Sequence, residues 1–207
     1  QGKATEQLTF KLGKVEIPIY NLTDTTLTDT EVKAIKFGLA ATYQMLGDKM
    51  AEDVNAIALT DQNMLSGSKD AYGYAMHEPR LAGLTASARH EASTWHESSG
   101  WENHPLTETV VHEIGHLIDP TQKDRALEAK WARAGGWQGP GFEAKPDSGK
   151  PHDHANSPME DWAYSWEKLV LHVGHDWDDT WKHDSEDGWY PMPARFDPKR
   201  REFALEH

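Results

Sequence analysis

Residues 112–116 read H-E-x-x-H, which places two histidines four positions apart with a glutamate directly after the first. On an α-helix, residues four apart lie one above the other, about 6 Å apart along the axis. Two imidazoles in this arrangement can bind one Zn²⁺, and a glutamate at the second position can hydrogen-bond a water molecule beside the metal. The spacing therefore predicts that His112 and His116 bind zinc and that Glu113 is a general base.

The motif lies in a segment whose apolar residues repeat at helical spacing. Val110, Ile114 and Leu117 form one stripe, which falls on the side of a helix opposite the two histidines. We expect a helix over residues 107–119 that packs its apolar side on the core and turns its histidines toward a cleft.

Asp119 follows the second histidine by three positions and has two interpretations. Its carboxylate can accept a hydrogen bond from a zinc-binding imidazole and hold that ring in place. Alternatively, it only ends the helix before Pro120. The sequence leaves both interpretations open.

A catalytic zinc site usually has three protein ligands and keeps its fourth position for water. A histidine six positions after His116 would mark the metzincin pattern, but Gln122 stands there. The best candidate for the third ligand is Glu160, at the start of the next amphipathic segment. Ser157 and Glu160 also have the spacing of a capping box, in which the glutamate only satisfies the start of a helix. Spacing alone does not decide between the two roles.

Three other residues are alternatives for the third ligand. Asp161 is the next best, while His172 and His175 are weaker because they lie at the far end of the same segment.

Two short segments carry a resemblance to a known family. Residues 112–119 read H-E-I-G-H-L-I-D and residues 160–166 read E-D-W-A-Y-S-W. They resemble the gluzincin metallopeptidases typified by the catalytic domain of anthrax lethal factor and the secreted Pro-Pro endopeptidases of clostridia, whose motifs are H-E-x-x-H-x-x-D and E-F-F-A-E-x-F. The resemblance implies that Glu160 is the third zinc ligand. This sequence departs from the family at Tyr164, where the family has a second glutamate.

The resemblance has two further implications. Residues 83–89 look like the strand that runs along the family's substrate cleft, which makes Thr85 and Arg89 candidate cleft residues. The family also has a tyrosine shortly before the third ligand, whose hydroxyl stabilises the oxyanion. Here that stretch has no tyrosine but contains His152 and His154. A protonated imidazole can do the same work, so we expect His154, then His152, to be the oxyanion donor, with Tyr164 as the third choice.

The composition limits both ligands and partners. The chain has 207 residues, no cysteine, and 21 Lys and Arg against 34 Asp and Glu, for a net charge of −13. Without thiolates, only imidazoles and carboxylates can bind zinc. Nucleic acids and anionic membranes require patches of Lys and Arg, so the charge argues against both. An acidic cleft also favours a basic or neutral polypeptide as substrate.

The elements that must position these residues follow from periodicity and turn signals. A capping box at Thr28 and Glu31 predicts a helix to residue 46, and Pro18 predicts that the strand around it lies at a sheet edge. We expect the histidines at 90, 96 and 104 at the surface. The other expected elements are strands at 15–19, 54–59 and 81–89, loops at 66–79, 90–106 and 136–157, and helices at 124–134 and 158–173.

We therefore predict one α+β domain over residues 1–204 with a zincin-like fold, in which a small twisted sheet supports the H-E-x-x-H helix and a second ligand-bearing helix. Residues 205–207 read as the remnant of a purification tag. The expected function is that of a zinc-dependent endopeptidase. The alternatives are the catalytic fragment of a toxin or effector protease with narrow specificity, and a tryptophan-rich binding module with a structural zinc site.

The expected partners and location follow from the same observations. We expect a monomer that acts on a polypeptide and has no nucleic-acid or membrane partner. The chain begins at Gln1 without a methionine, so an upstream segment is expected to have been removed. We expect secretion, either outside a bacterium or into a target cell.

Overall fold

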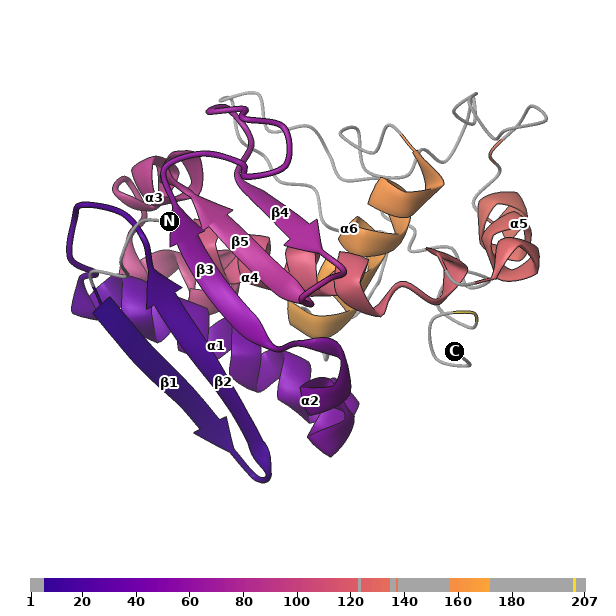
Figure 1. The fold of residues 1–207 in the computed structure, drawn as a ribbon, viewed down its shortest axis with the longest axis horizontal. Coiled ribbons are helices and arrows are strands. Elements are labelled where there is room, and N and C mark those ends of the chain that lie inside the picture. The colour runs from indigo at the N-terminus through magenta and orange to yellow at the C-terminus, as the bar shows by residue number, and fades with distance from the viewer. Residues whose placement is uncertain (1–5, 123, 135–136, 138–156, 172–202, 204–207) are drawn as a thin grey trace. The chain divides into compact units, whose positions relative to one another are not determined.

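The computed structural model describes residues 6–122, 124–134, 137, 157–171 and 203 (Figure 1). The chain divides into two compact units, Gln1–Ile118 and Asp119–His207. The single domain predicted over residues 1–204 stays a prediction.

The first unit contains the sheet and the helix that carries the H-E-x-x-H motif. Its elements are, in chain order, β1 (Glu6–Leu12), β2 (Val15–Asn21), α1 (Asp29–Leu46), α2 (Met50–Asp53), β3 (Ala56–Thr60), β4 (Gly73–Met76), β5 (Leu81–Thr85), α3 (Ala86–Ala92) and α4 (Pro105–Ile118).

The described part of the chain forms one mixed five-stranded sheet in the order β1-β2-β3-β5-β4. The three inner strands are parallel, and β1 and β4 pair antiparallel with their neighbours at the two edges. Parallel neighbours need a crossover connection, and α1 supplies it between β2 and β3. The small sheet and its helices confirm the α+β class.

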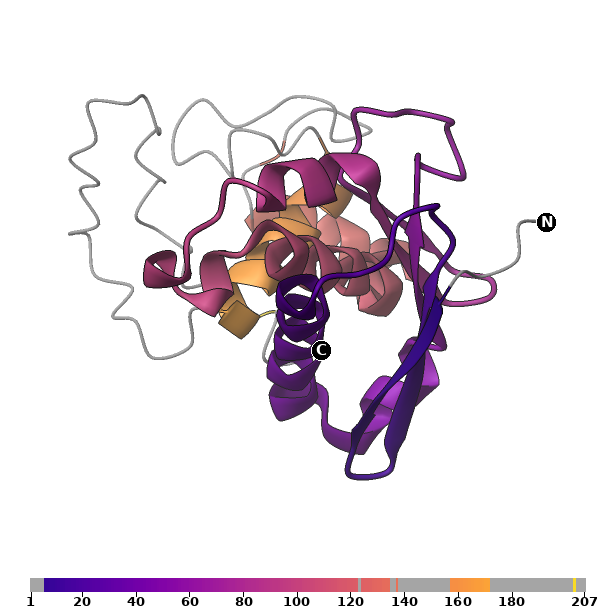
Figure 2. The ribbon, with the colours of Figure 1, turned by 90° about the vertical axis from the view of Figure 1, so that its left-hand side faces the viewer.

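The helices α1 and α4 lie on the same face of the sheet, as Figure 2 shows with the strands seen nearly edge-on. The two helices approach closely at Gly38, where a Cβ atom would lie 2.5 Å from Val110 Cγ1 and 3.1 Å from the carbonyl oxygen of Thr107. The Thr107 hydroxyl also donates to the carbonyl of Ala34 at 3.0 Å. Both contacts hold the first half of α4, just before the motif, against α1.

The start of α1 confirms the predicted capping box. The backbone N–H of Glu31 donates to Thr28 Oγ1 at 3.2 Å, and the Thr28 N–H donates to Glu31 Oε2 at 2.7 Å. Inside the helix, Ile35 and Leu39 are fully buried. Local sequence therefore determines both where α1 begins and which face it buries.

Three sequence-based expectations about the strands are wrong. The segment 66–79, expected as a loop, contains β4, and the strand expected over residues 81–89 ends at Thr85, where α3 begins. Pro18 lies in β2, which is an inner strand rather than an edge. A proline is tolerated there because pairing with β3 begins only at Ile19, so no N–H is required from Pro18 on that side.

The described part of the second unit is helical. It contains α5 (Arg125–Ala134) and α6 (Pro158–Leu171), which agrees with the helices expected at 124–134 and 158–173 up to residue 171. Buried Trp131, Trp162 and Phe203 form a cluster between them. The Trp131 Nε1–H donates to the carbonyl of Pro158 at 3.0 Å, which holds α5 at the start of α6.

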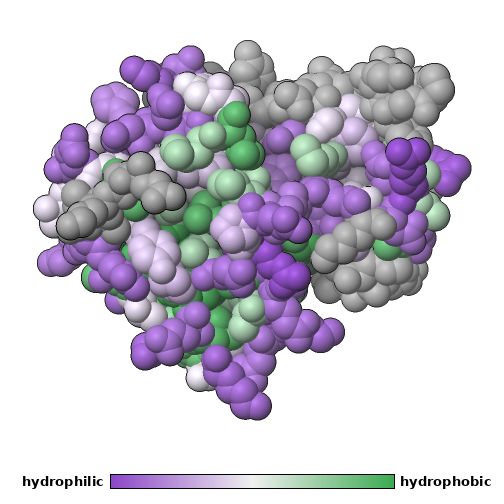
Figure 3. Space-filling view, viewed as in Figure 1, coloured by the Kyte–Doolittle hydropathy of each residue, from purple (hydrophilic) through white to green (hydrophobic). Residues whose placement is uncertain are grey.

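The described surface is mostly hydrophilic, with smaller hydrophobic areas among the strands, as Figure 3 shows for the face seen in Figure 1. This matches the mean hydropathy of −0.76. Among the described residues, no helix is both long and apolar enough to cross a bilayer.

Candidate metal centre

The two histidines of the motif lie on adjacent turns of α4. Their ring centroids are 4.9 Å apart, and the ring planes are inclined at 81°. Both His116 and Glu113 are only 7% exposed. The predicted pair therefore exists as a compact, largely buried arrangement on a single helix.

The helix begins where His104 caps it. The His104 carbonyl accepts the N–H groups of Thr107 and Glu108 at 2.8 and 3.0 Å, and its Nδ1 accepts the N–H of Leu106 at 3.1 Å. Pro105, whose missing N–H needs no partner at this position, is the first helical residue. Three donors at the start of α4 are thus satisfied by one residue.

His104 was expected at the surface and is instead fully buried. Its ring stacks on Trp101 with centroids 6.0 Å apart and lies 4.7 Å from the ring of Trp95. Burial lowers the pKa of His104 below its ordinary value, and the charge of Glu31 opposes the shift in part. A neutral imidazole is the form whose Nδ1 can accept a hydrogen bond, so the low pKa is consistent with the capping role.

Glu113 packs against the backbone of the edge strand β4. A Cβ atom at Gly73 would lie 2.5 Å from Glu113 Oε1, 2.7 Å from its Cγ and 2.8 Å from Thr109 Cγ2. Only glycine leaves this space for the Glu113 side chain. Nothing in the sequence around Gly73 indicates this contact, because the turn signals of residues 66–79 predict a loop there.

The neighbouring Tyr74 lies on the opposite face of the sheet, since successive strand residues alternate. Its ring covers Gly83, where a Cβ atom would lie 2.1 Å from Tyr74 Cζ. Burial raises the pKa of Tyr74, a hydrogen bond with Thr60 opposes this, and the charge of Glu113 raises the pKa further. Gly73 on β4 thus accommodates Glu113 on one face of the sheet, and Gly83 on β5 accommodates Tyr74 on the other.

Glu160 lies in the first turn of α6, in the second unit, and is half-buried. Its backbone N–H donates to Ser157 Oγ at 3.2 Å, so Ser157 caps the helix as the spacing predicted. This bond uses the main chain of Glu160, and it does not test the role of the carboxylate.

Asp161 has a different environment from Glu160. It is 1% exposed, and its Oδ2 accepts the Nε1–H of Trp137 at 3.1 Å. Its carboxylate is therefore part of the interior of the second unit, which favours Glu160 over Asp161 as a metal ligand.

The candidate oxyanion donors are placed only in part. His152 and His154 lie outside the described residues, as do His172 and His175. Tyr164 is half-buried and packs against Ala132 and Trp137 in the second unit.

Asp119 is buried at the start of the second unit. Its Oδ1 accepts the backbone N–H of Thr121 at 2.8 Å and the Thr121 hydroxyl at 2.6 Å, which forms the short turn η4 (Pro120–Gln122). These contacts agree with the interpretation that Asp119 ends the helix. Its proposed bond to an imidazole stays a prediction.

Thr85, a candidate cleft residue, lies in the interior of the first unit. It is fully buried, and its hydroxyl donates to the carbonyls of Ala71 and Tyr72. It thereby fixes the end of the loop that leads into β4. Thr85 ends β5, which is an inner strand. The edge strand on this side of the sheet is β4.

Arg89, the other candidate cleft residue, makes its described contacts within the first unit. Its Nε and Nη2 donate to the Glu31 carboxylate at 2.6 and 3.1 Å, and its Nη1 donates to the hydroxyls of Thr23 and Thr25 at 3.0 and 2.7 Å. All three guanidinium nitrogens are used in this way. Arg89 therefore ties α3 to α1 and to the segment before it.

In comparisons with known proteins, no family model, no curated protein and no solved structure matches the chain.

Proposed function

We propose that this chain is a zinc-dependent endopeptidase in which His112, His116 and Glu160 bind Zn²⁺. One observation carries the proposal: the two imidazoles lie 4.9 Å apart on α4, with the largely buried Glu113 beside them on the same helix. Glu160 is proposed as the third ligand because the motif resemblance implies it. Its neighbour Asp161 is a weaker candidate because its carboxylate accepts a hydrogen bond from Trp137.

The donor set fits zinc. Zn²⁺ is usually four-coordinate and binds imidazole nitrogens and carboxylate oxygens. Catalytic zinc sites use three protein ligands and keep the fourth position for water. Two inclined imidazoles on adjacent turns can direct one nitrogen each at a single ion. When bound, zinc would acidify a water molecule and polarise a carbonyl group.

The residues of this chain supply the proton transfer. Glu113 accepts the proton of the attacking water and returns it to the leaving amine. The absence of a side chain at Gly73 leaves the space that the carboxylate occupies, and proton transfer requires the carboxylate to lie within hydrogen-bond distance of the water. His154, His152 or Tyr164 stabilises the oxyanion in this proposal.

An extended polypeptide is the substrate that the edge strand favours. Because β4 is the last strand of the described sheet, its outer edge has backbone groups that can pair with an added strand. Gly73 of that strand contacts Glu113. A peptide paired along β4 would thus pass close to the general base.

The substitution Glu113→Gln tests the proposal. It removes the proton acceptor and preserves the shape of the side chain, so peptide cleavage should fall by about 10³-fold while zinc content stays at one ion per chain. Cleavage of a peptide library followed by mass spectrometry, together with metal analysis, measures both. The control is Glu108→Gln, one turn earlier on α4. Cleavage by the Glu113 variant at the wild-type rate would refute the mechanism.

A further inference from the structure

The loop between β3 and β4, residues 61–72, carries the most exposed large apolar side chains of the described part of the chain. Met64 is 62% exposed, Leu65 63% and Tyr72 52%, whereas every other large apolar side chain described is at most 43% exposed. A hydrophobic area lies on the face of the molecule where this loop bends over the start of β4 (Figure 1 and Figure 3). Apolar side chains exposed together on one segment are typical of a binding surface.

Met64 and Leu65, which we call the apolar pair, lie in a turn that Asn63 closes. The Asn63 Oδ1 accepts the N–H groups of Leu65 and Ser66 at 2.8 and 3.0 Å. Its backbone carbonyl accepts the N–H of Gly67 at 2.8 Å. The backbone of the turn is thus fixed by its own hydrogen bonds, which lowers the entropy cost of binding to it.

Asn63 also ties the loop to β4. Its Nδ2 donates to the carbonyl of Gly73 at 3.4 Å, and Gly73 is the residue whose missing side chain leaves space for Glu113. Leu65 follows Asn63 by two positions, so its backbone lies at most about 7 Å from that of Asn63. The apolar pair is therefore a neighbour of the proposed general base, at the same end of β4.

The hydrogen bonds of β4 show which of its backbone groups reach the outer edge. The Thr85 N–H donates to the carbonyl of Tyr72, one position before β4 begins, at 2.9 Å. Hydrogen-bonded and non-hydrogen-bonded pairs alternate in an antiparallel ladder, so the backbone groups of Gly73 and Ala75 point away from β5. The Asn63 amide uses the Gly73 carbonyl. An added strand can therefore pair with the Gly73 N–H and with both backbone groups of Ala75.

We propose that the apolar pair selects substrates with a large apolar residue one to three positions after the scissile bond, an inference that rests on the proposed endopeptidase function. A peptide paired antiparallel to β4, as β5 is, runs from Ala75 toward Gly73. It passes Glu113 there and then meets the turn of Met64 and Leu65. Each residue of an extended peptide advances about 3.4 Å, so the first three residues after the scissile bond reach the apolar pair.

A polypeptide fits this loop better than a lipid surface does. The loop carries two aspartates, Asp61 and Asp70, against one lysine, Lys69, and the whole chain has a net charge of −13. An anionic bilayer repels such a segment, whereas an uncharged apolar side chain of a peptide does not meet this repulsion.

The first test is a digest of a mixed peptide library by the full chain in the presence of zinc. Mass spectrometry gives the residue frequencies on both sides of each cut. We expect leucine, methionine and phenylalanine to be enriched within the first three positions after the cut. Enrichment only before the cut would overturn the proposal, as would the lack of any preference for apolar residues. A digest without any cleavage would refute the endopeptidase function itself, and this inference with it.

Variants of the apolar pair locate the preference. Two ten-residue peptides are compared that differ only in having leucine or serine at the preferred position. The double substitution Met64→Ser and Leu65→Ser should lower the ratio of kcat/KM for the leucine peptide over the serine peptide about tenfold. Leu65→Glu should favour a third peptide, with arginine at that position, over the leucine peptide by about fivefold.

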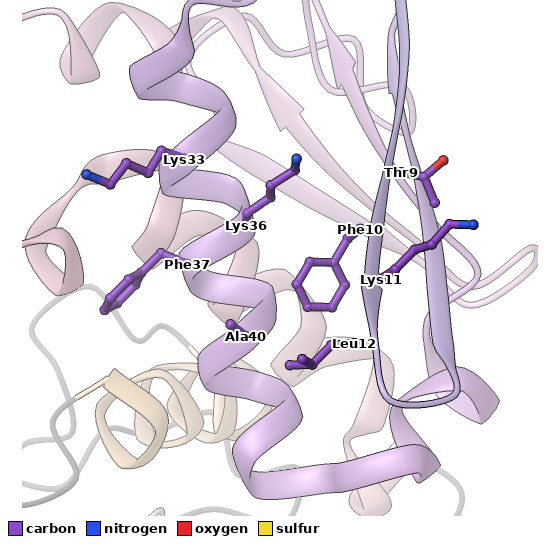
Figure 4. A pocket seen from close by; sticks show the side chains of 8 residues that line it. All are labelled: Thr9, Phe10, Lys11, Leu12, Lys33, Lys36, Phe37 and Ala40. Carbon is purple, nitrogen blue, oxygen red and sulfur yellow. The ribbon is translucent and has the colours of Figure 1, made fainter.

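The matched control is the double substitution Phe37→Ser and Met45→Ser on α1. These side chains are 38% and 36% exposed, and Phe37 lines the groove between β1 and α1 at the other edge of the sheet (Figure 4). The control should keep the wild-type ratio, and circular dichroism melting checks that every variant folds. An equal fall in the ratio for control and loop variants, or an unchanged ratio in the loop variants, would overturn the proposal while peptide cleavage itself persists. Binding of phosphatidylglycerol vesicles that depends on Leu65, with no effect on the ratio, would overturn it in favour of a lipid.

Discussion

The two edges of the sheet differ in what lies beside them, although both are antiparallel strands at the end of the same parallel core. β4 has four residues, and its Gly73 contacts Glu113. β1 has seven residues, and residues of β1 and α1 line a groove of about 600 Å³ beside it. An exposed strand edge offers the same backbone groups in either case. The difference teaches that side chains supplied by the helices, α4 at one edge and α1 at the other, decide which chemistry an edge can support.

The largest effect is expected from a substitution in β4 that would displace Glu113. Gly73→Ala forces Glu113 and Thr109 away, because a Cβ atom would lie under 3 Å from both. Displacement of a catalytic group by about 1 Å can lower the rate about 10²-fold, so kcat for peptide cleavage should fall by that amount. Ala75→Ser on the same strand is the control. An unchanged rate for the Gly73 variant would mean that the Glu113 position is not set by β4.

The next effect concerns the pair that joins α1 to α3. Arg89→Met leaves the Glu31 carboxylate, whose side chain is only 12% exposed, without its cation. Loss of one partner from a largely buried pair costs about 2–4 kcal/mol, so urea denaturation should show a drop in the free energy of unfolding of that size. Lys11→Met, which breaks an exposed pair with Glu16, should change it by less than about 1 kcal/mol. Equal effects would contradict the structural role of Arg89.

A smaller effect is a pH dependence of stability at the start of α4. The pKa of His104 lies below its ordinary value of 6.5 in the folded chain because the ring is buried. Between the two pKa values the unfolded chain binds more protons, so stability falls as pH drops below 6.5. His104→Asn keeps a capping acceptor and cannot titrate. Its melting temperature should therefore lose the part of the pH dependence that develops below 6.5, and an unaltered pH profile would rule out this source.

The smallest effect is expected when a substitution near β1 is tested for its influence on the site beside β4. If the two edges act separately, Lys36→Glu on α1, in the groove beside β1, should leave kcat/KM for an uncharged peptide within about twofold of the wild type, because screened charges act over about 10 Å. The same assay with Gly73→Ala shows the contrast. A large loss of activity in the Lys36 variant would show that the two edges are coupled.

Local features of the fold were predictable because short-range signals determine them. The capping box at Thr28, the apolar stripe of α4 and the start of α6 after Ser157 all appear as expected. The strand β4 was missed because it has only four residues and follows a segment rich in turn signals. Its pairing with β5 is a contact between segments that no local pattern reports.

The candidate site divides in the same way. The i, i+4 spacing alone places His112 and His116 together, since one helix holds both rings. Arg89 could not be assigned from sequence, because its partner Glu31 lies 58 positions away. The buried position of His104 was equally hidden, since a polar stretch containing tryptophans predicts the surface as readily as the interior.

By itself the sequence determined the chemistry of the motif helix: two imidazoles, one carboxylate and an apolar side, all set by the 3.6-residue period. Only the tertiary structure decided where that carboxylate lies. Gly73 leaves the space that Glu113 occupies, and the order of strands puts that glycine at one edge and the groove between β1 and α1 at the other. The physical reason is that helix spacing is a local property of the backbone, whereas strand order and close packing depend on which distant segments meet.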